Sequence, residues 1–172
     1  MSAKESVSFR IIENHPNDSR VQISKDNTFQ ALTGRMGTGG GNVPMIEENA
    51  VVRRLTPMEC ERLQGYPDGW TDIGEWTDSK GKKHKDTDSP RYKALGNSIA
   101  LPFWEWMAAR ICKQYDRPIT MASLFDGIGG FPLVFKRNGA TPVWASEIEE
   151  FPIAVTKIRF PEEEEECESE IE

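Results

Sequence analysis

The stretch SLFDGIGGF, residues 123–131, constrains the fold of this 172-residue sequence more than any other feature. It stands between RPITMASLF, which is typical of a buried strand, and FPLVFKRNG, which is typical of a helix closed by Gly139. Glycines at such a turn let a ligand approach the backbone closely, and the helix that follows presents unpaired N–H groups. Because TPVWASE predicts a second strand and EEFPIAVTKIRF a second helix, we expect half of an α/β doubly wound sheet.

The spacing within this turn disfavours a dinucleotide. The dinucleotide fingerprint needs Gly or Ala three residues after its second glycine, whereas Pro132 stands at that place after Gly127 and Gly129. Glu147 follows Gly127 by 20 residues, at the end of the second predicted strand, where a carboxylate can accept hydrogen bonds from both ribose hydroxyls. These features favour an S-adenosylmethionine methyltransferase, and they leave open another nucleotide-binding protein or a purely structural turn.

Charge is distributed very unevenly along the chain. The formal net charge is -7, but residues 162–172, EEEEECESEIE, contain eight glutamates and no basic residue. The rest of the chain has 20 acidic and 21 basic residues, so its charge is no obstacle to DNA binding. We expect residues 162–172 to form a disordered acidic tail.

The three cysteines and two histidines do not form a recognisable metal or disulfide pattern. Cys60, Cys112 and Cys167 are odd in number and contain no CxxC pair, which favours a reducing compartment. No stretch has the length of a membrane span, and the start of the chain lacks the apolar core of a signal peptide. We therefore expect a cytoplasmic protein with no metal and no membrane partner.

Four segments of the first half have readable local patterns. VSFRII and RVQIS predict two short strands, and GRMGTGGGN predicts a mobile surface loop, because no Gly-Lys-Ser/Thr follows its glycines. LTPMECERLQGYPDGW predicts a short helix with Thr56 as its cap, Glu59 completing a capping box and Gly65 ending it.

The middle of the chain predicts a polar loop and then the longest helix. The sequence KGKKHK could contact phosphates, but a solvated loop is the favoured interpretation. RYKALGNSIALPFWEWMAARICKQY contains a helix beginning near Ser98. Its expected apolar stripe consists of Ile99, Phe103, Met107 and either Ile111 or Ala108.

Four blocks in one chain resemble the DNA cytosine-5 methyltransferase family. SLFDGIGGF resembles its first block, ASEIE its second, RRLTPMECERLQGYPDGW its ninth and RYKALGNSIALP its tenth. TFQALTGRMGTGGGNVP also resembles the end of the family's target-recognition region. In most of the family the first block opens the chain and the tenth closes it, so the order here implies a circular permutation joined at residues 116–119.

The resemblance implies an α/β fold and a division of the chain. We expect a partial doubly wound, Rossmann-like S-adenosylmethionine methyltransferase sheet, with a small remnant of the target-recognition region made mainly of strands and loops. The implied parts are the end of the target-recognition region (1–50), the ninth- and tenth-block helices (51–118), the first half of the cofactor-binding domain (119–161) and the acidic tail (162–172).

The resemblance also implies which residues contact S-adenosylmethionine. The methionine and ribose side is lined by Phe125, Asp126, Gly127, Ile128 and Gly130; Glu147 holds the ribose hydroxyls, Ile148 flanks the adenine, and Asn97, Ser98 and Ile99 close the methionine end. Position 126 is often alanine in the family, so Asp126 departs from the pattern. Arg54 is expected to tie the recognition region to the core.

The family's Pro-Cys nucleophile is missing from this sequence. None of the three cysteines follows a proline, and Glu48, Asn49 and Ala50 only approximate the family's Glu-Asn-Val block, in the wrong neighbourhood. No catalytic residue is therefore expected here. The resemblance implies a subunit or part of an enzyme that acts on DNA with a second chain bearing both blocks, or by self-association, and that is inactive alone. The alternatives are a non-catalytic DNA-binding or regulatory remnant, and a different adenosine-binding protein.

Overall fold

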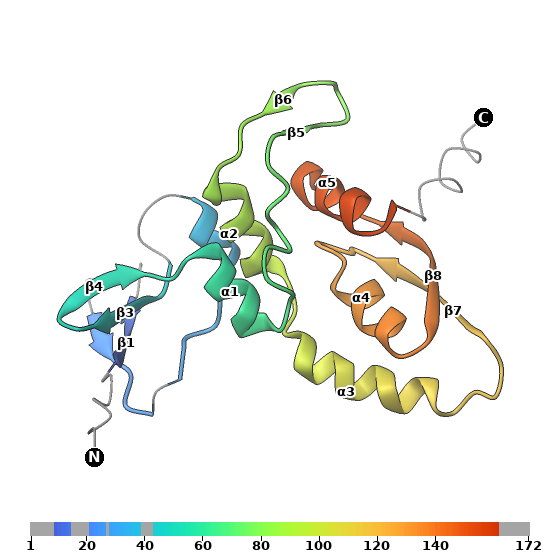
Figure 1. Ribbon diagram of the computed structural model, residues 1–172, viewed down its shortest axis with the longest axis horizontal. Helices are drawn as coiled ribbons and strands as arrows, with labels where there is room; N and C mark the ends of the chain where they lie inside the picture. The colour runs from blue at the N-terminus through green and yellow to red at the C-terminus, as the bar shows by residue number, and fades with distance from the viewer. Residues whose placement is uncertain (1–8, 15–20, 27, 39–42, 162–172) are drawn as a thin grey trace, which may run out of the picture.

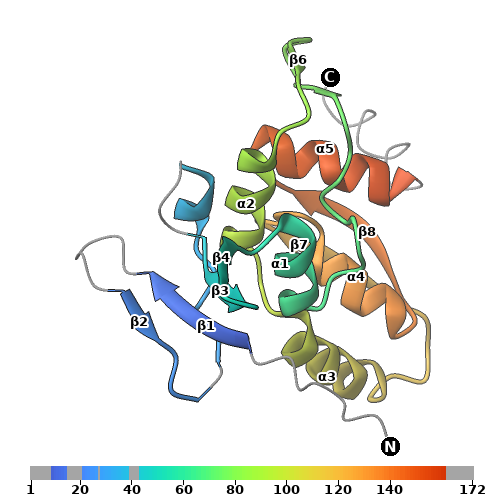
Figure 2. The same ribbon diagram turned by 60° about the vertical axis from the view of Figure 1, so that its left-hand side comes forward.

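The computed structural model describes residues 9–14, 21–26, 28–38 and 43–161. The predicted acidic tail and the glycines at 39–41 lie outside these ranges. The fold is mixed α/β with three small sheets, as the α/β prediction requires at this coarse level. Figures 1 and 2 show the first sheet at one end, a parallel strand pair at the other, and α1 and α2 between them. No helix within the described ranges is long and apolar enough to cross a membrane.

The first sheet is antiparallel, with strand order β2-β1-β3-β4. Its strands are β1 (Phe9–Asn14), β2 (Val21–Ile23), β3 (Met45–Glu48) and β4 (Val51–Arg54). The first two were predicted and the β3–β4 hairpin was not. Asn49 and Ala50 form its two-residue turn with φ values of 51° and 62°, which matches the turn geometry that twisted hairpins favour. Glu48, Asn49 and Ala50 therefore form the end and the turn of this hairpin.

One of the two central helices packs closely on a short 3-10 helix. α1 (Pro57–Gln64) has the predicted capping box, and Gly65 ends it in the left-handed conformation. The 3-10 helix η1 (Gly34–Gly37) packs on α2 (Asp88–Asn97), and its Met36 is only 3% exposed. The mobile-loop prediction is therefore wrong for this segment. Gly34 lies directly against the Asn97 side chain, a contact that excludes a Cβ.

Two elements between α1 and the next long helix were not predicted. α2 has no clear apolar stripe in its sequence DSPRYKALGN, and its buried residues are Arg91, Ala94 and Leu95. A hairpin of β5 (Trp76–Thr77) and β6 (Lys83–His84) replaces the expected solvated loop.

The longest helix, α3 (Leu101–Cys112), buries only part of the predicted stripe. Ala108, the predicted alternative to Ile111, is buried, as is Leu101, whereas Phe103 and Ile111 are 58% and 39% exposed. Trp104 packs edge-on against Phe131 of α4, with ring centroids 4.8 Å apart. Apolar residues surround α3 on most sides, so the period alone does not select the face that packs.

The C-terminal part is the predicted strand–helix–strand–helix unit. It consists of β7 (Ile119–Leu124), α4 (Gly130–Arg137), β8 (Ala140–Ser146) and α5 (Glu150–Arg159), and β7 pairs with β8 in parallel. One face of the pair is buried, as Ser123, Ala140 and Pro142 show. The opposite face exposes Leu124 and Trp144, at 65% and 43%, so the prediction of a fully buried strand is wrong for β7.

Candidate cofactor site at the glycine turn

The glycine turn has an unusual backbone with one open position. Phe125, Gly127 and Gly129 have φ values of 54°, 60° and 79°, in the left-handed region. A Cβ at Gly129 would lie 2.5 Å from the Phe160 ring, whereas nothing lies within 4 Å of one at Gly127. Gly129 is therefore required by packing, and Gly127 presents bare backbone to open space, where a ligand can approach.

Backbone N–H groups hold Glu147 at the carboxyl end of β8. Oε2 accepts a hydrogen bond from Gly127 N at 2.6 Å, and Oε1 accepts from Ile148 N and Glu149 N at 2.7 and 2.9 Å. These bonds join the end of β8 to the glycine turn after β7. Because each carboxylate oxygen has two lone pairs, Oε2 retains acceptor capacity for a ligand hydroxyl.

Two apolar side chains stand exposed beside this carboxylate. Phe125 precedes the turn and Ile148 follows Glu147, and each is 86% exposed. Large apolar side chains with this exposure are suited to contact a planar ligand. The arrangement can therefore hold a group that combines an aromatic ring with neighbouring hydroxyls.

Asp126 points into the protein rather than outwards. Its Oδ1 accepts a 2.6 Å hydrogen bond from Ser123 Oγ, and its buried Oδ2 has no hydrogen-bond partner. Burial raises the pKa of Asp126 to about 6, opposed by the Ser123 hydrogen bond and increased by the Glu147 charge. The charged carboxylate is therefore disfavoured at this position.

The segments that contain Tyr66 and Ser98–Ile99 also lie against the glycine turn. Ser98 Oγ and Tyr66 Oη share a 2.5 Å hydrogen bond. A Cβ on Gly130 would lie 2.5 Å from Tyr66 Oη and 3.1 Å from Ile99 Cγ1. Ser98 and Ile99 thus lie beside the turn as expected, whereas the exposed Asn97 packs against Gly34.

The loop after α1 braces the turn, a role that the sequence did not predict. Trp70 Nε1 donates to the Ile128 carbonyl at 2.7 Å, and Arg159 of α5 donates to the Trp70 carbonyl at 2.9 Å. The fully buried Glu61 accepts from Gly69 N and Thr71 N at 2.7 and 2.8 Å, which fixes the loop. The GYPDGW stretch was visible, but no local pattern reveals a contact 58 residues away.

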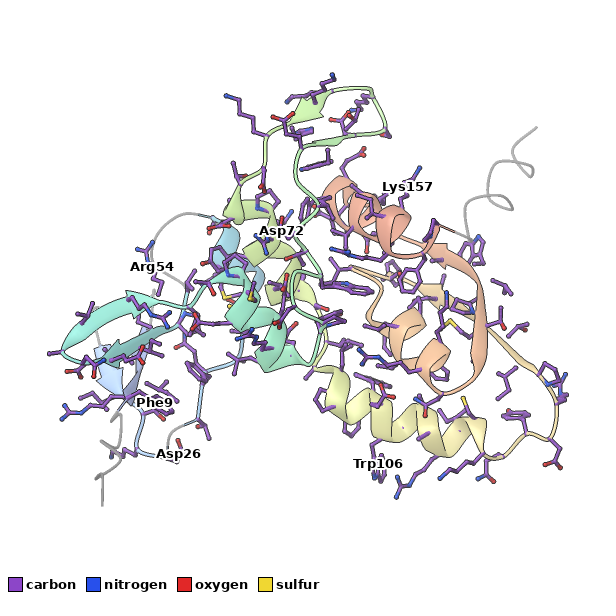
Figure 3. The ribbon with its side chains drawn as sticks, viewed as in Figure 1. Phe9, Asp26, Arg54, Asp72, Trp106 and Lys157 are labelled. Carbon is purple, nitrogen blue, oxygen red and sulfur yellow. The ribbon has the colours of Figure 1, made fainter. Side chains whose placement is uncertain are left out.

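Arg53, rather than Arg54, ties the first sheet to the helices. Its guanidinium makes two 2.8 Å hydrogen bonds to the Glu59 carboxylate, which lowers the pKa of Glu59 to about 2. Arg54 is exposed and extends outwards from β4 in Figure 3. Neighbouring side chains of a strand point to opposite faces, so the contact expected of Arg54 is made by Arg53.

The two cysteines within the described ranges lie on helices α1 and α3. Cys60 is fully buried on α1, and its pKa is raised to about 12, chiefly by burial. Cys112 lies at the end of α3 and is half-buried. Cys167 falls outside the described residues. The same ranges contain no cluster of three or more acidic, His or Cys residues that could hold a metal.

Several DNA methyltransferases are similar to parts of the chain. It is 43% identical over 87 residues to a DNA N-6-adenine-methyltransferase of Escherichia phage P1, covering 38% of this chain and 11% of the relative. It is 36% identical over 94 residues to the type II methyltransferase M.Bsp6I of Bacillus sp. (strain RFL6), covering 55% and 26%. M.HgiCI of Herpetosiphon aurantiacus is 30% identical over 74 residues, covering 43% and 14%. The chain thus spans about a quarter or less of each of these relatives.

A family model matches nearly the whole chain in two segments. The family is described as C-5 cytosine-specific DNA methylase, and the matches cover residues 3–113 and 119–171. The glycine turn and Glu147 fall in the second segment, and Tyr66, Trp70 and Ser98 in the first. The chain belongs to the C-5 cytosine-specific DNA methylase family.

Proposed function

We propose that this chain is one part of a split, circularly permuted DNA cytosine-5 methyltransferase. It supplies most of the S-adenosylmethionine pocket and the end of a target-recognition region. Glu147 accepts hydrogen bonds from the ribose hydroxyls, Phe125 and Ile148 contact the adenosine, and the backbone around Gly127 lies against the ligand. The turn residues Asp126, Ile128 and Gly130 form the pocket wall, with Ser98 and Ile99 at the methionine end.

The observation that carries this proposal is the meeting of separate blocks at one turn. Tyr66 and Trp70 from the ninth block, and Ser98 and Ile99 from the tenth, contact or hydrogen-bond residues 126–130, and Glu147 bonds to Gly127. The order along the chain also fits a permutation. α3 ends at Cys112, packs on α4, and connects directly to β7 at Ile119, between the two segments of the family match.

The parallel pair supports a requirement for further polypeptide. Helices α3, α4 and α5 share one core, with Ala108, Val134 and Val155 fully buried. The other face exposes Leu124 and Trp144, and β7 and β8 have no further strand beside them within the described residues. Parallel strands are normally covered on both faces, so we propose that a second chain with the Pro-Cys and Glu-Asn-Val blocks adds strands and helices here.

Each part has a defined chemical task in this scheme. Bound S-adenosylmethionine supplies the methyl group as a sulfonium, and this chain holds and orients that donor. The second chain supplies the cysteine thiolate that adds to C6 of a flipped cytosine and activates C5. We assign C5 of cytosine from the family match. The adenine named for the phage P1 relative belongs to a protein of which this chain covers 11%.

Cofactor binding tests the site before any catalysis. Calorimetry with S-adenosylmethionine and the full chain should show binding that is saturable and weak, because the remaining strands of the domain are absent. Complete lack of binding, both alone and with a Pro-Cys chain, would contradict the site. A non-catalytic DNA-binding remnant is the second candidate, favoured by the buried, high-pKa Cys60, and it predicts that no second chain restores methyl transfer.

A further inference from the structure

We propose that the hairpin formed by residues 76–85 is a contact surface for the phosphate backbone of duplex DNA. We call it the lysine hairpin, because residues 79–85, SKGKKHK, contain four lysines and no acidic residue. This inference rests on the proposed function only in taking DNA as the substrate. Its test is direct binding, so it can fail while the cofactor site stands, and the reverse also holds.

The turn of the lysine hairpin is pre-organised by one carboxylate. Asp78 Oδ1 accepts from Lys80 N and Lys82 N at 3.0 and 2.9 Å, and Oδ2 lies 2.8 Å from His84 Nε2. Gly81 supplies the left-handed residue of the turn, with φ of 77°. The backbone that carries the lysines is therefore fixed before a ligand arrives, which lowers the entropic cost of binding.

Both the turn and the first strand of the hairpin are anchored to the first turn of α5. Ser79 donates to Glu150 twice, through its N–H at 2.9 Å and its hydroxyl at 2.6 Å. Trp76 stacks on His84 at 4.1 Å between ring centroids and meets Phe151 edge-on at 5.5 Å. Because Glu150 follows Glu147 by three residues, the hairpin stands beside the candidate cofactor site, on the side of α5 and α2 seen in Figures 1 and 2.

The positive charges of the hairpin are available for an external partner. Lys80, Lys82, Lys83 and Lys85 are all exposed. Within the described part of the chain none of them forms an ion pair, although the charge of Lys80 slightly lowers the pKa of Glu150. Four unpaired cations on a fixed ribbon are an electrostatic complement to a row of phosphates.

The chemistry of the hairpin favours a duplex backbone over other polyanions. Residues 79–85 contain no apolar side chain to enter a membrane interface, where basic surfaces are usually accompanied by Trp, Phe or Leu. The aromatic residue of the hairpin, Trp76, is occupied by His84, so no free ring is offered for stacking with single-stranded bases. Lysines act as point charges and lack the fork that reads base edges, so the contact is independent of sequence.

The test is the salt dependence of binding to a short unmethylated duplex, measured by fluorescence anisotropy with the full chain. The main variant changes Lys80, Lys82, Lys83 and Lys85 to Gln. A matched pair of double variants, Lys82→Gln/Lys85→Gln and Lys113→Gln/Arg117→Gln, removes two charges from the hairpin or from the far end of α3. Figures 1 and 2 place α3 on the opposite side of the molecule from the hairpin.

We expect the slope of log affinity against log salt to fall by about 0.9 for each lysine that contacts a phosphate, so by up to about 3.6 in the quadruple variant. The hairpin double variant should change the slope more than the α3 control, with unchanged thermal unfolding. Overlapping curves for wild type and quadruple variant would overturn the proposal. So would a lysine dependence seen only with single-stranded RNA or anionic vesicles. A third variant changes Glu162–Glu166 to Gln. If the lysine substitutions no longer affect DNA binding in this background, the lysines act by binding the acidic tail, and the proposal is overturned.

Discussion

Trp70 donates its indole N–H to the carbonyl oxygen of Ile128 at 2.7 Å, across 58 residues of sequence. This bond connects the loop after α1 to the glycine turn. It is buried, so neither partner can exchange it for water. The conformation of the candidate cofactor site therefore depends on a residue outside the C-terminal unit.

Removing this bond should destabilise the chain and weaken cofactor binding. Trp70→Phe keeps an aromatic ring but leaves the Ile128 carbonyl unpaired, which should cost about 1–3 kcal/mol in the free energy of unfolding. Urea unfolding measures this change. Trp106→Phe is the control, because Trp106 is 51% exposed and extends outwards from α3 in Figure 3, and its effect should stay within about 0.5 kcal/mol. Equal effects of the two substitutions would contradict the bracing role.

Glu147 should contribute to cofactor affinity through its carboxylate. Glu147→Ala removes a charged acceptor for the ribose hydroxyls, and we expect a loss of about 1.5–3 kcal/mol in binding free energy by calorimetry. Glu149→Ala is a matched control two residues away, since its side chain pairs with Lys93 and its backbone N–H remains. If both variants bind S-adenosylmethionine like the wild type, the ribose assignment is wrong.

Asp126 should make stability depend on pH in an unusual direction. Its folded-state pKa of about 6 lies above the ordinary aspartate value of 3.8, so the folded chain binds the extra proton between these pH values. Its contribution to the free energy of unfolding is therefore favourable at low pH and is lost as the pH rises from about 4 to 6, by up to about 3 kcal/mol. Asp126→Asn, which keeps an acceptor for Ser123, should remove this dependence.

The quantity to measure is the difference in free energy of unfolding between Asp126→Asn and the wild type at each pH. Other groups titrate equally in both proteins, so their contributions cancel. Denaturant unfolding at pH 4 and pH 7 should show the variant gaining relative stability at the higher pH. A difference that does not change with pH would show that the folded-state pKa of Asp126 is not raised.

The exposed face of the parallel pair should be needed for assembly and not for folding. Trp144→Glu places a charge on this face, where a second chain would bury it without a partner, and should weaken the complex at least about tenfold. Val52→Glu is the control on β4 of the first sheet, where Val52 is 54% exposed. Sedimentation of each variant with a Pro-Cys chain gives the affinity. An unaffected Trp144→Glu complex would place the interface elsewhere.

The sequence predicted the local elements with strong end signals and missed those defined by tertiary contacts. The capping box of α1 and the strand–helix–strand unit around the glycine turn were readable, because their signals are short-range. α2 was missed because its residues lack an apolar period, and it is held by tertiary packing, mainly on η1 and α1. Ser98, Ile99 and Glu147 lie beside the turn, and their contacts with the cofactor stay a prediction, whereas Trp70 and Glu61 are connected to the turn only through the fold.

We proposed cytosine C5 as the methylated position on the basis of the family match, and this proposal can be checked separately. DNA methylated by the assembled enzyme should yield 5-methylcytosine on digestion to nucleosides. N6-methyladenine as the product would agree with the name of the phage P1 relative and would overturn the cytosine assignment.

The most direct test of the central claim is tritiated methyl transfer to unmethylated DNA, measured with this chain alone, with a chain bearing the Pro-Cys and Glu-Asn-Val blocks alone, and with both together. We expect no transfer by this chain alone, because none of its cysteines follows a proline and Cys60 is a buried thiol with a raised pKa. We expect transfer when both chains are present, accompanied by a higher melting temperature as the exposed strands become paired. Robust transfer by this chain alone, or none with any such partner, would contradict the account.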